Sequence, residues 1–444
     1  MKFNYRNYVI ISFIIISILY IMPAFFQFNF DKDDRITGFQ FAMPRILSGD
    51  LPNHLLMLNS FFIDGDFDLK NNYEGVINNE SIQAGFNHKG KYLETLYYDS
   101  KNNRYLEKKP DNFNSSDIKV FCTHPPGIAV FTGIFIYPAI LMHHYELVEP
   151  FCIFISIFAM LTGLIYIYKT VYYYTSDEKV SLTTLIIFAF ATPLWHYGIS
   201  WQIESFIAPF MFIAYYYFAV KNKNLVPGIL FAVILSMRYP VIVPIAVFAC
   251  YRIYEKKYRE MLLFILPAFL IGLLILIYQN TIYGNPFIVP QGYYFRTFAN
   301  PLKGIFGSLF DIKQGLLAFA PVLIFSVFGI KHFYKKNLKQ AIFILILLVM
   351  YSLIYTVRGV NWEGGGYSNR YLVPLIPFLA IFFADFIKNC RNNKMLTVVY
   401  IFAGISFLIN IQGAFLPALI WGYEPWHPIK LIIVKFSKLK EVLN

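Results

Sequence analysis

The chain has 444 residues, of which 57% are hydrophobic and 19% aromatic, and its mean hydropathy is +0.51. Only 14% of the residues are charged, whereas a soluble domain carries roughly 25%. The net charge of +12 would suggest nucleic acid in a soluble protein, but here Lys and Arg form short clusters between apolar runs. This distribution follows the positive-inside rule, so we expect no nucleic-acid partner. The composition predicts an all-α, polytopic membrane protein.

The first apolar run, residues 8–28, follows the short basic stretch MKFNYRN. No small-residue cleavage site comes after it, so we expect a retained helix rather than a removed signal peptide. Residues 29–123 form a long polar segment, which we expect to be the first extracytoplasmic loop. Within it, residues 39–63 have apolar side chains at helical spacing and predict a helix lying on the membrane surface. Residues 71–119 are rich in Asn, Lys and Asp and are expected to have little structure of their own.

Apolar runs then continue to residue 416, and we expect about 11–13 transmembrane helices in one domain covering residues 1–444. The course of residues 143–250 is open. If each apolar run crosses the membrane once, Lys221 and Lys223 lie outside. If the run 225–250 is instead a hairpin broken at Arg238-Tyr239-Pro240, both lysines lie inside, and another early run must then fail to cross fully. Three basic clusters are expected in the cytoplasm, namely residues 252–259, 331–339 and 388–394.

Several carboxylates lie in SGDLPNHLLMLNSFFIDGDFDLKNNYE, residues 48–74, next to the membrane. Asp64, Asp66 and Asp68 surround a glycine, a pattern that is typical of turns, and we interpret them as turn and capping residues. Asp50 follows a glycine at the head of the predicted surface helix. For Asp50, both a helix cap and a general base are open.

Arginines lie near the expected outer edges of the later runs, where each could be a simple interfacial anchor. Several arginines together with a histidine would also match the oxygens of a phosphate group. No His-x-x-x-His spacing occurs, so we expect no required metal. No phosphate-binding loop or dinucleotide glycine motif occurs either, so we expect no nucleotide cofactor.

Several segments are similar, in the same order, to segments of the GT-C superfamily of polytopic membrane glycosyltransferases. GDLPNHLLMLNSFFIDGDFDLKNNYE resembles the first outer loop of these enzymes, where Asp50 matches a motif aspartate and Pro52 its proline. The chain departs from the motifs at Leu51, which replaces an acidic residue, and at Asn369, where proline is common. The other similar segments are THPPG (123–127), as in protein mannosyltransferases, GNPF…GYY (284–294), GIFGSLFDIKQGLLAFAPVLIF (304–325) and NWEGGGYSNRYLVPLIPF (361–378).

The resemblance implies an enzyme that moves a sugar, with inversion, from a polyprenyl-phosphate donor to a lipid, glycan or protein acceptor. Such a transfer needs one base for the acceptor hydroxyl and cationic groups for the leaving phosphate. Asp50 is the expected base, and Asp33 and Asp34, nearer the first helix, are alternatives. The expected phosphate-binding residues are His124, Arg238 and Arg370, and the expected substrate-binding residues are His54, Glu363 and Tyr367. Trp201 could stack on a sugar, although an interface anchor is the better interpretation.

Two other functions stay open. A transporter or flippase of a lipid-linked glycan would need ionisable residues at mid-membrane, whereas most polar residues here lie in the outer loops. A homologue that has lost activity and acts as a scaffold is the second alternative, because Leu51 departs from the motif. By resemblance we expect a prokaryotic plasma (inner) membrane, with the site on the extracytoplasmic side and in contact with membrane lipids.

Overall fold

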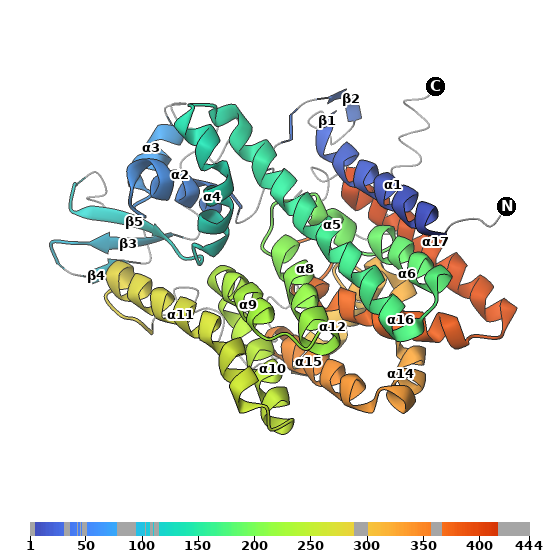
Figure 1. Cartoon of the computed structure of the whole chain (residues 1–444). Helices are drawn as coiled ribbons and strands as arrows, with labels where there is room; N and C mark the ends of the chain where they lie inside the picture. Colours follow the sequence, from blue (N-terminus) through green and yellow to red (C-terminus); the bar gives the residue numbers. More distant parts are fainter. Residues whose placement is uncertain are drawn as a thin grey trace.

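A computed structural model shows a bundle of helices that carries two small antiparallel sheets at one end (Figure 1). The structure describes residues 5–30, 36–41, 43–44, 46, 51–77, 95–102, 104–106, 110, 115–287, 301–356 and 366–415. Within these ranges, 6 helices are long and apolar enough to cross a membrane. The chain is thus an integral membrane protein that is mostly helical, as the composition predicts.

The long apolar helices arise from the apolar runs of the sequence, since a span of about 20 such residues can bury its backbone hydrogen bonds in lipid. They are α1 (Tyr5–Phe25), α5 (Val148–Thr175), α11 (Tyr258–Tyr283), α15 (Leu338–Thr356), α16 (Ile376–Asn389), which follows a 3₁₀ segment at Arg370–Leu375, and α17 (Asn393–Phe415). Shorter helices complete the bundle. They are α4 (Gly127–Leu141), α6 (Glu178–Phe190), α7 (Leu194–Gly198), α8 (Glu204–Tyr215) with a π-helical extension (Tyr216–Val220), α9 (Leu225–Met237), α10 (Ile242–Tyr254), α12 (Pro301–Phe310), α13 (Leu316–Phe319) and α14 (Phe325–Lys336).

The apolar run at 225–250 forms two helices with a break between them, as in the hairpin alternative. Helix α9 ends at Met237, Arg238 is extended, and α10 begins at Ile242. The Arg252 guanidinium, near the end of α10, donates to the carbonyl of Phe218 at 2.9 Å. Because Phe218 lies just before Lys221 and Lys223, both lysines share one end of the bundle with the 252–259 cluster.

The other two basic clusters lie at this same end, which we call the basic end. Lys336 Nζ donates to Asn389 Oδ1 at 3.2 Å, and Lys388 donates to the carbonyl of Thr175. Gln340 donates to the Tyr251 hydroxyl at 3.2 Å and joins the two sides of the bundle there. The basic end therefore unites clusters 252–259, 331–339 and 388–394.

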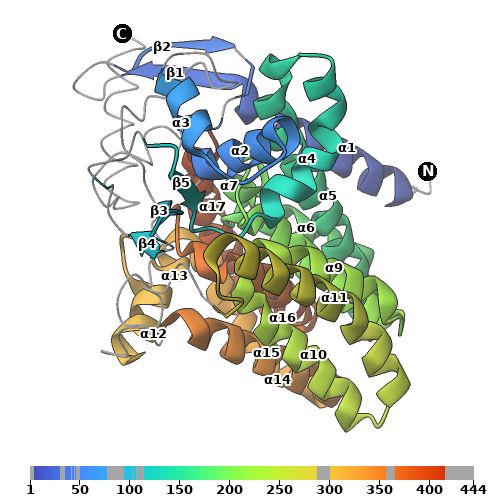
Figure 2. The same cartoon turned by 90° about the vertical axis from the view of Figure 1, so that its left-hand side faces the viewer.

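Helix α4 is an early apolar run that stays at one end of the bundle and does not extend to the basic end. Its first residue, Gly127, lies so close to the backbone of Ser236, near the end of α9, that a Cβ there would collide with it. Its last residue, Leu141, leads into the start of α5. Figures 1 and 2 show α4 beside α2 at the end opposite α10 and α14, which we call the loop end.

The segment after α1 is more structured than its composition suggests. Strands β1 (Phe26–Phe30) and β2 (Ile36–Phe41) pair antiparallel, and β3 (Thr95–Asp99) lies between β4 (Arg104–Leu106) and β5 (Ile118–Cys122) in a three-stranded sheet. A short helix, α3 (Lys70–Ile77), stands between the two sheets. The expectation of little structure in residues 71–119 was therefore wrong for these elements, because apolar residues such as Tyr97 and Val120 alternate into the core.

The predicted surface helix is also different from expectation. Residues 36–41 form a strand, and the helix proper is α2 (Leu51–Asn59), which continues as a π-helical turn to Asp64. All residues of α2 are buried, including its polar ones. The Tyr73 hydroxyl, for example, donates to Asn53 Oδ1 at 2.5 Å. This helix is packed inside the protein, and none of its faces is exposed.

The acidic turn after α2 is confirmed as a structural feature. Asp66 Oδ1 accepts hydrogen bonds from the Ser60 hydroxyl at 2.8 Å and from the backbone of Asp68 at 2.9 Å. Asp68 Oδ1 accepts from Val120 N at 2.9 Å, which ties the turn to β5. Burial raises the pKa of Asp68, although these backbone hydrogen bonds act in the opposite direction. Asp64 accepts from Asn72 at 2.7 Å, so all three carboxylates hold the local chain path.

Candidate functional site

The predicted phosphate-binding arginines meet on one aromatic ring at the loop end. Arg238 stands in the break between α9 and α10, and Arg370 opens the 3₁₀ segment before α16. The guanidinium carbon of Arg238 lies 5.3 Å from the centre of the Tyr371 ring, and that of Arg370 lies 5.2 Å from it. Two cations from distant segments are thus brought to one place, as the sequence predicts.

A buried carboxylate holds one of the two arginines. Arg238 Nη1 lies 2.5 Å from Glu204 Oε1, and their side chains are only 11% and 1% exposed. Glu204 is the first residue of α8. An ion pair that is removed from water is stable only with close geometry of this kind. Glu204 was missed in the sequence, where the signal would have been an acidic residue opening an apolar run.

Neighbouring tyrosines support the ring on which the arginines meet. The Tyr371 ring is nearly parallel to that of Tyr355, with ring centres 4.3 Å apart and an interplanar angle of 8°. Tyr355, at the end of α15, also contacts Tyr351 one turn earlier, at 5.4 Å. On the other side of Arg370, the Tyr197 hydroxyl donates to the carbonyl of Tyr367 at 2.8 Å. Stacked rings of this size restrict the ring of Tyr371, and with it the two guanidinium groups.

The two predicted histidines also come together. The rings of His54 in α2 and His124 after β5 lie 5.1 Å apart at 51°. The His54 ring meets Trp201 edge to face, at 6.4 Å. Trp201 is 1% exposed, so the expectation that it anchors the membrane interface was wrong. Helix α2 and the segment after β5 therefore meet beside Trp201.

The histidine pair and the arginine pair are linked through short stretches of chain. Trp201, against His54, stands just before Glu204, which binds Arg238. On the other side, His124 stands just before Gly127, which packs on the backbone of Ser236, two residues before Arg238. Four of the predicted residues, His54, His124, Arg238 and Arg370, thus belong to one continuous region at the loop end.

Tyr367 has a different environment. It is buried, and its hydroxyl donates to the carbonyl of Ile409 in α17 at 3.1 Å. Its ring lies 4.6 Å from that of His196 and packs so close to Gly413 that a Cβ there would collide with it. This placement supports a packing role between the 366–375 segment and α17 rather than a substrate contact.

Four predicted residues, Asp33, Asp34, Asp50 and Glu363, lie outside the described residues. Helix α2 begins at Leu51, directly after Asp50. In the part of the chain that the structure describes, no group of three or more His, Cys, Asp or Glu side chains could hold a metal ion.

The side chains of the described region are of the types that could bind an anion. Two guanidinium groups, held by an aromatic ring and by one carboxylate, present several N–H donors, which suit the oxygens of a phosphate group. Beside them, the buried imidazoles of His54 and His124 add further polar groups. In comparisons with known proteins, no family model matches the chain, and no curated protein matches it.

Proposed function

We propose that the protein is a membrane glycosyltransferase that moves a sugar from a polyprenyl-phosphate donor to a lipid, glycan or protein acceptor. The observation that carries this proposal is the meeting of Arg238 and Arg370 on the ring of Tyr371 at the loop end. A phosphate attached to a membrane-embedded chain needs cationic groups to bind it, and both arginines stand at breaks between helices. The resemblance of the loop motifs to the GT-C superfamily supports the same function.

The mechanism follows from the chemistry of inversion at the anomeric carbon. Asp50 takes the proton of the acceptor hydroxyl, whose oxygen forms the new bond to the anomeric carbon. The bond between that carbon and the phosphate oxygen breaks, and polyprenyl phosphate leaves with the electron pair. Arg238 and Arg370 stabilise the negative charge that develops on the leaving phosphate. Glu204 acts as a positioning residue, because its carboxylate fixes the guanidinium of Arg238.

The positions of the charged residues favour a glycosyltransferase over a transporter. Glu204 begins α8, and Arg238 follows the end of α9, so their ion pair lies at helix ends. Buried Asp385, near the end of α16, pairs at 3.5 Å with Lys336 at the basic end. A transporter would also place ionisable residues within its long spans, and α11, for example, has no charged residue after Glu260.

The proposed orientation places the loop end outside a prokaryotic plasma membrane and the basic end in the cytoplasm. We expect a membrane-impermeant thiol reagent added outside to modify a cysteine at Asn102, between β3 and β4, but not one at Asn337, between α14 and α15. The native Cys250 and Cys390, which are not buried, are first replaced by serine, whereas Cys122 and Cys152 are buried and can stay. Labelling of the Asn337→Cys variant alone would reverse the orientation and remove the proposed site.

The phosphate-binding role is tested directly by Arg370→Ala. We expect this variant to bind polyprenyl-phosphate donor about tenfold to a hundredfold more weakly, because a charge-assisted hydrogen bond contributes about 1.5–3 kcal/mol. The dissociation constant is measured on detergent-purified protein. Arg259→Ala is the matched control, since Arg259 is exposed at the basic end. Equal dissociation constants for the two folded variants would contradict the assignment of Arg370.

A further inference from the structure

Helix α12 has an unusual distribution of side chains. Leu302, Phe306 and Phe310 recur every fourth residue and are 65%, 60% and 54% exposed. The opposite side has small residues, Gly304 and Ser308, and both are buried. Residues four apart share one face of a helix. The outward face of α12 is thus apolar and aromatic, although the helix is too short to span a membrane.

The inward face of α12 rests on the end of α15. A Cβ at Gly304 would collide with the carbonyl of Thr356, the last residue of α15. The residue before Thr356 is Tyr355, whose ring stacks on Tyr371. Gly304 thus contacts Thr356, the chain neighbour of Tyr355, and Tyr355 stacks on Tyr371, the ring that the guanidinium groups of Arg238 and Arg370 face.

Helix α15, like α12, has an exposed apolar surface. On α15, Ile346, Val349 and Met350 are exposed and lie on one side of a helix long enough to span the membrane. Such side chains at membrane depth meet acyl or isoprenoid chains rather than water. With its phosphate on the arginines, a lipid-linked donor would find apolar surface for its hydrocarbon chain on α15 and α12.

We propose that the outward face of α12, formed by Leu302, Phe306 and Phe310, is the binding surface for the isoprenoid chain of the donor. This inference rests on the proposed function and names the part of the molecule that recognises the lipid. Phe306, in the middle of the face and 6.4 Å from the Phe310 ring, is its central residue. Phosphate and chain are then recognised separately, the first by Arg238 and Arg370 and the second by α12.

The test compares two sugar-free probes, polyprenyl phosphates of about eleven and about two isoprene units. Binding to the purified full chain is measured for the wild type and for Phe306→Ser. We expect the variant to bind the long probe about tenfold more weakly, since removal of a phenyl ring forfeits a large apolar contact, and to bind the short probe as the wild type does. Phe306→Leu, which restores an apolar side chain, is expected to recover most of the affinity.

Phe269→Ser is the matched control, because Phe269 is a similarly exposed phenylalanine on α11. If Phe269→Ser weakens the long probe as much as Phe306→Ser, the surface of α12 contacts only bulk lipid and the inference is overturned. An equal loss for both probes in Phe306→Ser, or no loss for either, overturns it as well. If the protein binds the long probe through α12 but transfers no sugar, the lipid-binding role of α12 is kept and the glycosyltransferase function is rejected. The two proposals can therefore fail separately.

Discussion

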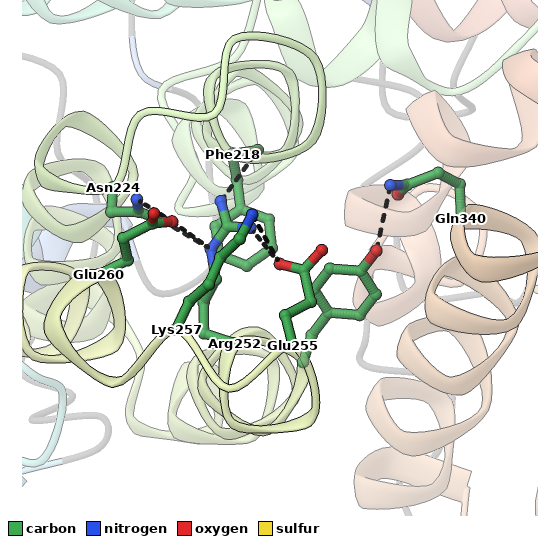
Figure 3. A network of polar contacts seen from close by, with 8 residues as sticks. Phe218, Asn224, Arg252, Glu255, Lys257, Glu260 and Gln340 are labelled. Atoms are coloured by element: carbon green, nitrogen blue, oxygen red, sulfur yellow. Dashed lines mark hydrogen bonds and ion pairs between the residues drawn. The ribbon is translucent and has the colours of Figure 1, made fainter.

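Replacing Arg252 with alanine is expected to destabilise the folded protein by about 1–3 kcal/mol for each buried acceptor that loses its donor. Arg252 is 2% exposed and lies in the centre of a polar network at the basic end (Figure 3). Its guanidinium donates to Asn224 Oδ1 at 2.8 Å, to Glu255 Oε2 at 2.5 Å and to the carbonyl of Phe218 at 2.9 Å. The loss should appear as a large decrease in melting temperature in detergent.

Two variants isolate the cause. Arg259→Ala removes an exposed arginine seven residues further along the chain and should change stability by no more than about 0.5 kcal/mol. Arg252→Lys keeps the positive charge but loses the planar fork that reaches several acceptors, so its melting temperature should fall between those of the wild type and Arg252→Ala. A melting temperature of Arg252→Ala equal to that of Arg259→Ala would show that the network does not stabilise the fold.

This network also shows that a charge cluster in a sequence can contain both buried and exposed residues. Residues 252–259 were interpreted as an orientation signal, and their position with the other basic clusters at one end agrees with that interpretation. The Lys/Arg pattern alone does not distinguish the buried Arg252 from the exposed Arg259, because the difference depends on α9 and α11 packing beside α10. The acceptors Asn224 and Phe218 are far from Arg252 in the chain, so no local pattern predicts the contacts.

Prediction from the sequence was most accurate for features that depend on residues close together in the chain. Membrane helices require long apolar runs, so their approximate positions followed from composition. A proline beside a polar residue breaks such a run, and the chain indeed turns at Arg238-Tyr239-Pro240. Asp64, Asp66 and Asp68 were interpreted correctly as turn residues because their hydrogen bonds are made mainly to nearby groups.

Prediction failed where burial depends on distant elements. The apolar spacing of residues 39–63 predicted a helix on the membrane surface, but Asn53 is bonded to Tyr73, and His54 lies against His124 and Trp201. For the candidate site, Arg238 and Arg370 were identified from their type and their place near the outer edges. Glu204 and Tyr371, which hold these arginines, were not identified because each stands within an apolar stretch and has no special spacing.

The base hypothesis concerns Asp50, which lies outside the described residues and directly before α2. Two roles compete for it. As a helix cap it would contribute about 1 kcal/mol to stability. As a general base it would accept the proton of the acceptor hydroxyl, a contribution of about 10²-fold or more in rate. The burial of α2 next to His124 and Trp201 places the start of this helix in the region of the proposed site.

Asp50→Asn separates these two roles, because asparagine caps a helix about as well as aspartate but cannot take the proton. If Asp50 is the base, this variant should keep its melting temperature and its affinity for the donor, while its turnover decreases about 100-fold or more. Asp50→Ala should lose turnover equally and about 1 kcal/mol of stability in addition. The measurement is sugar transfer by purified protein, with the melting temperature recorded on the same samples. Full turnover in Asp50→Asn would assign the base to Asp33 or Asp34, and full turnover in the corresponding asparagine variants of all three aspartates would reject the proposed mechanism.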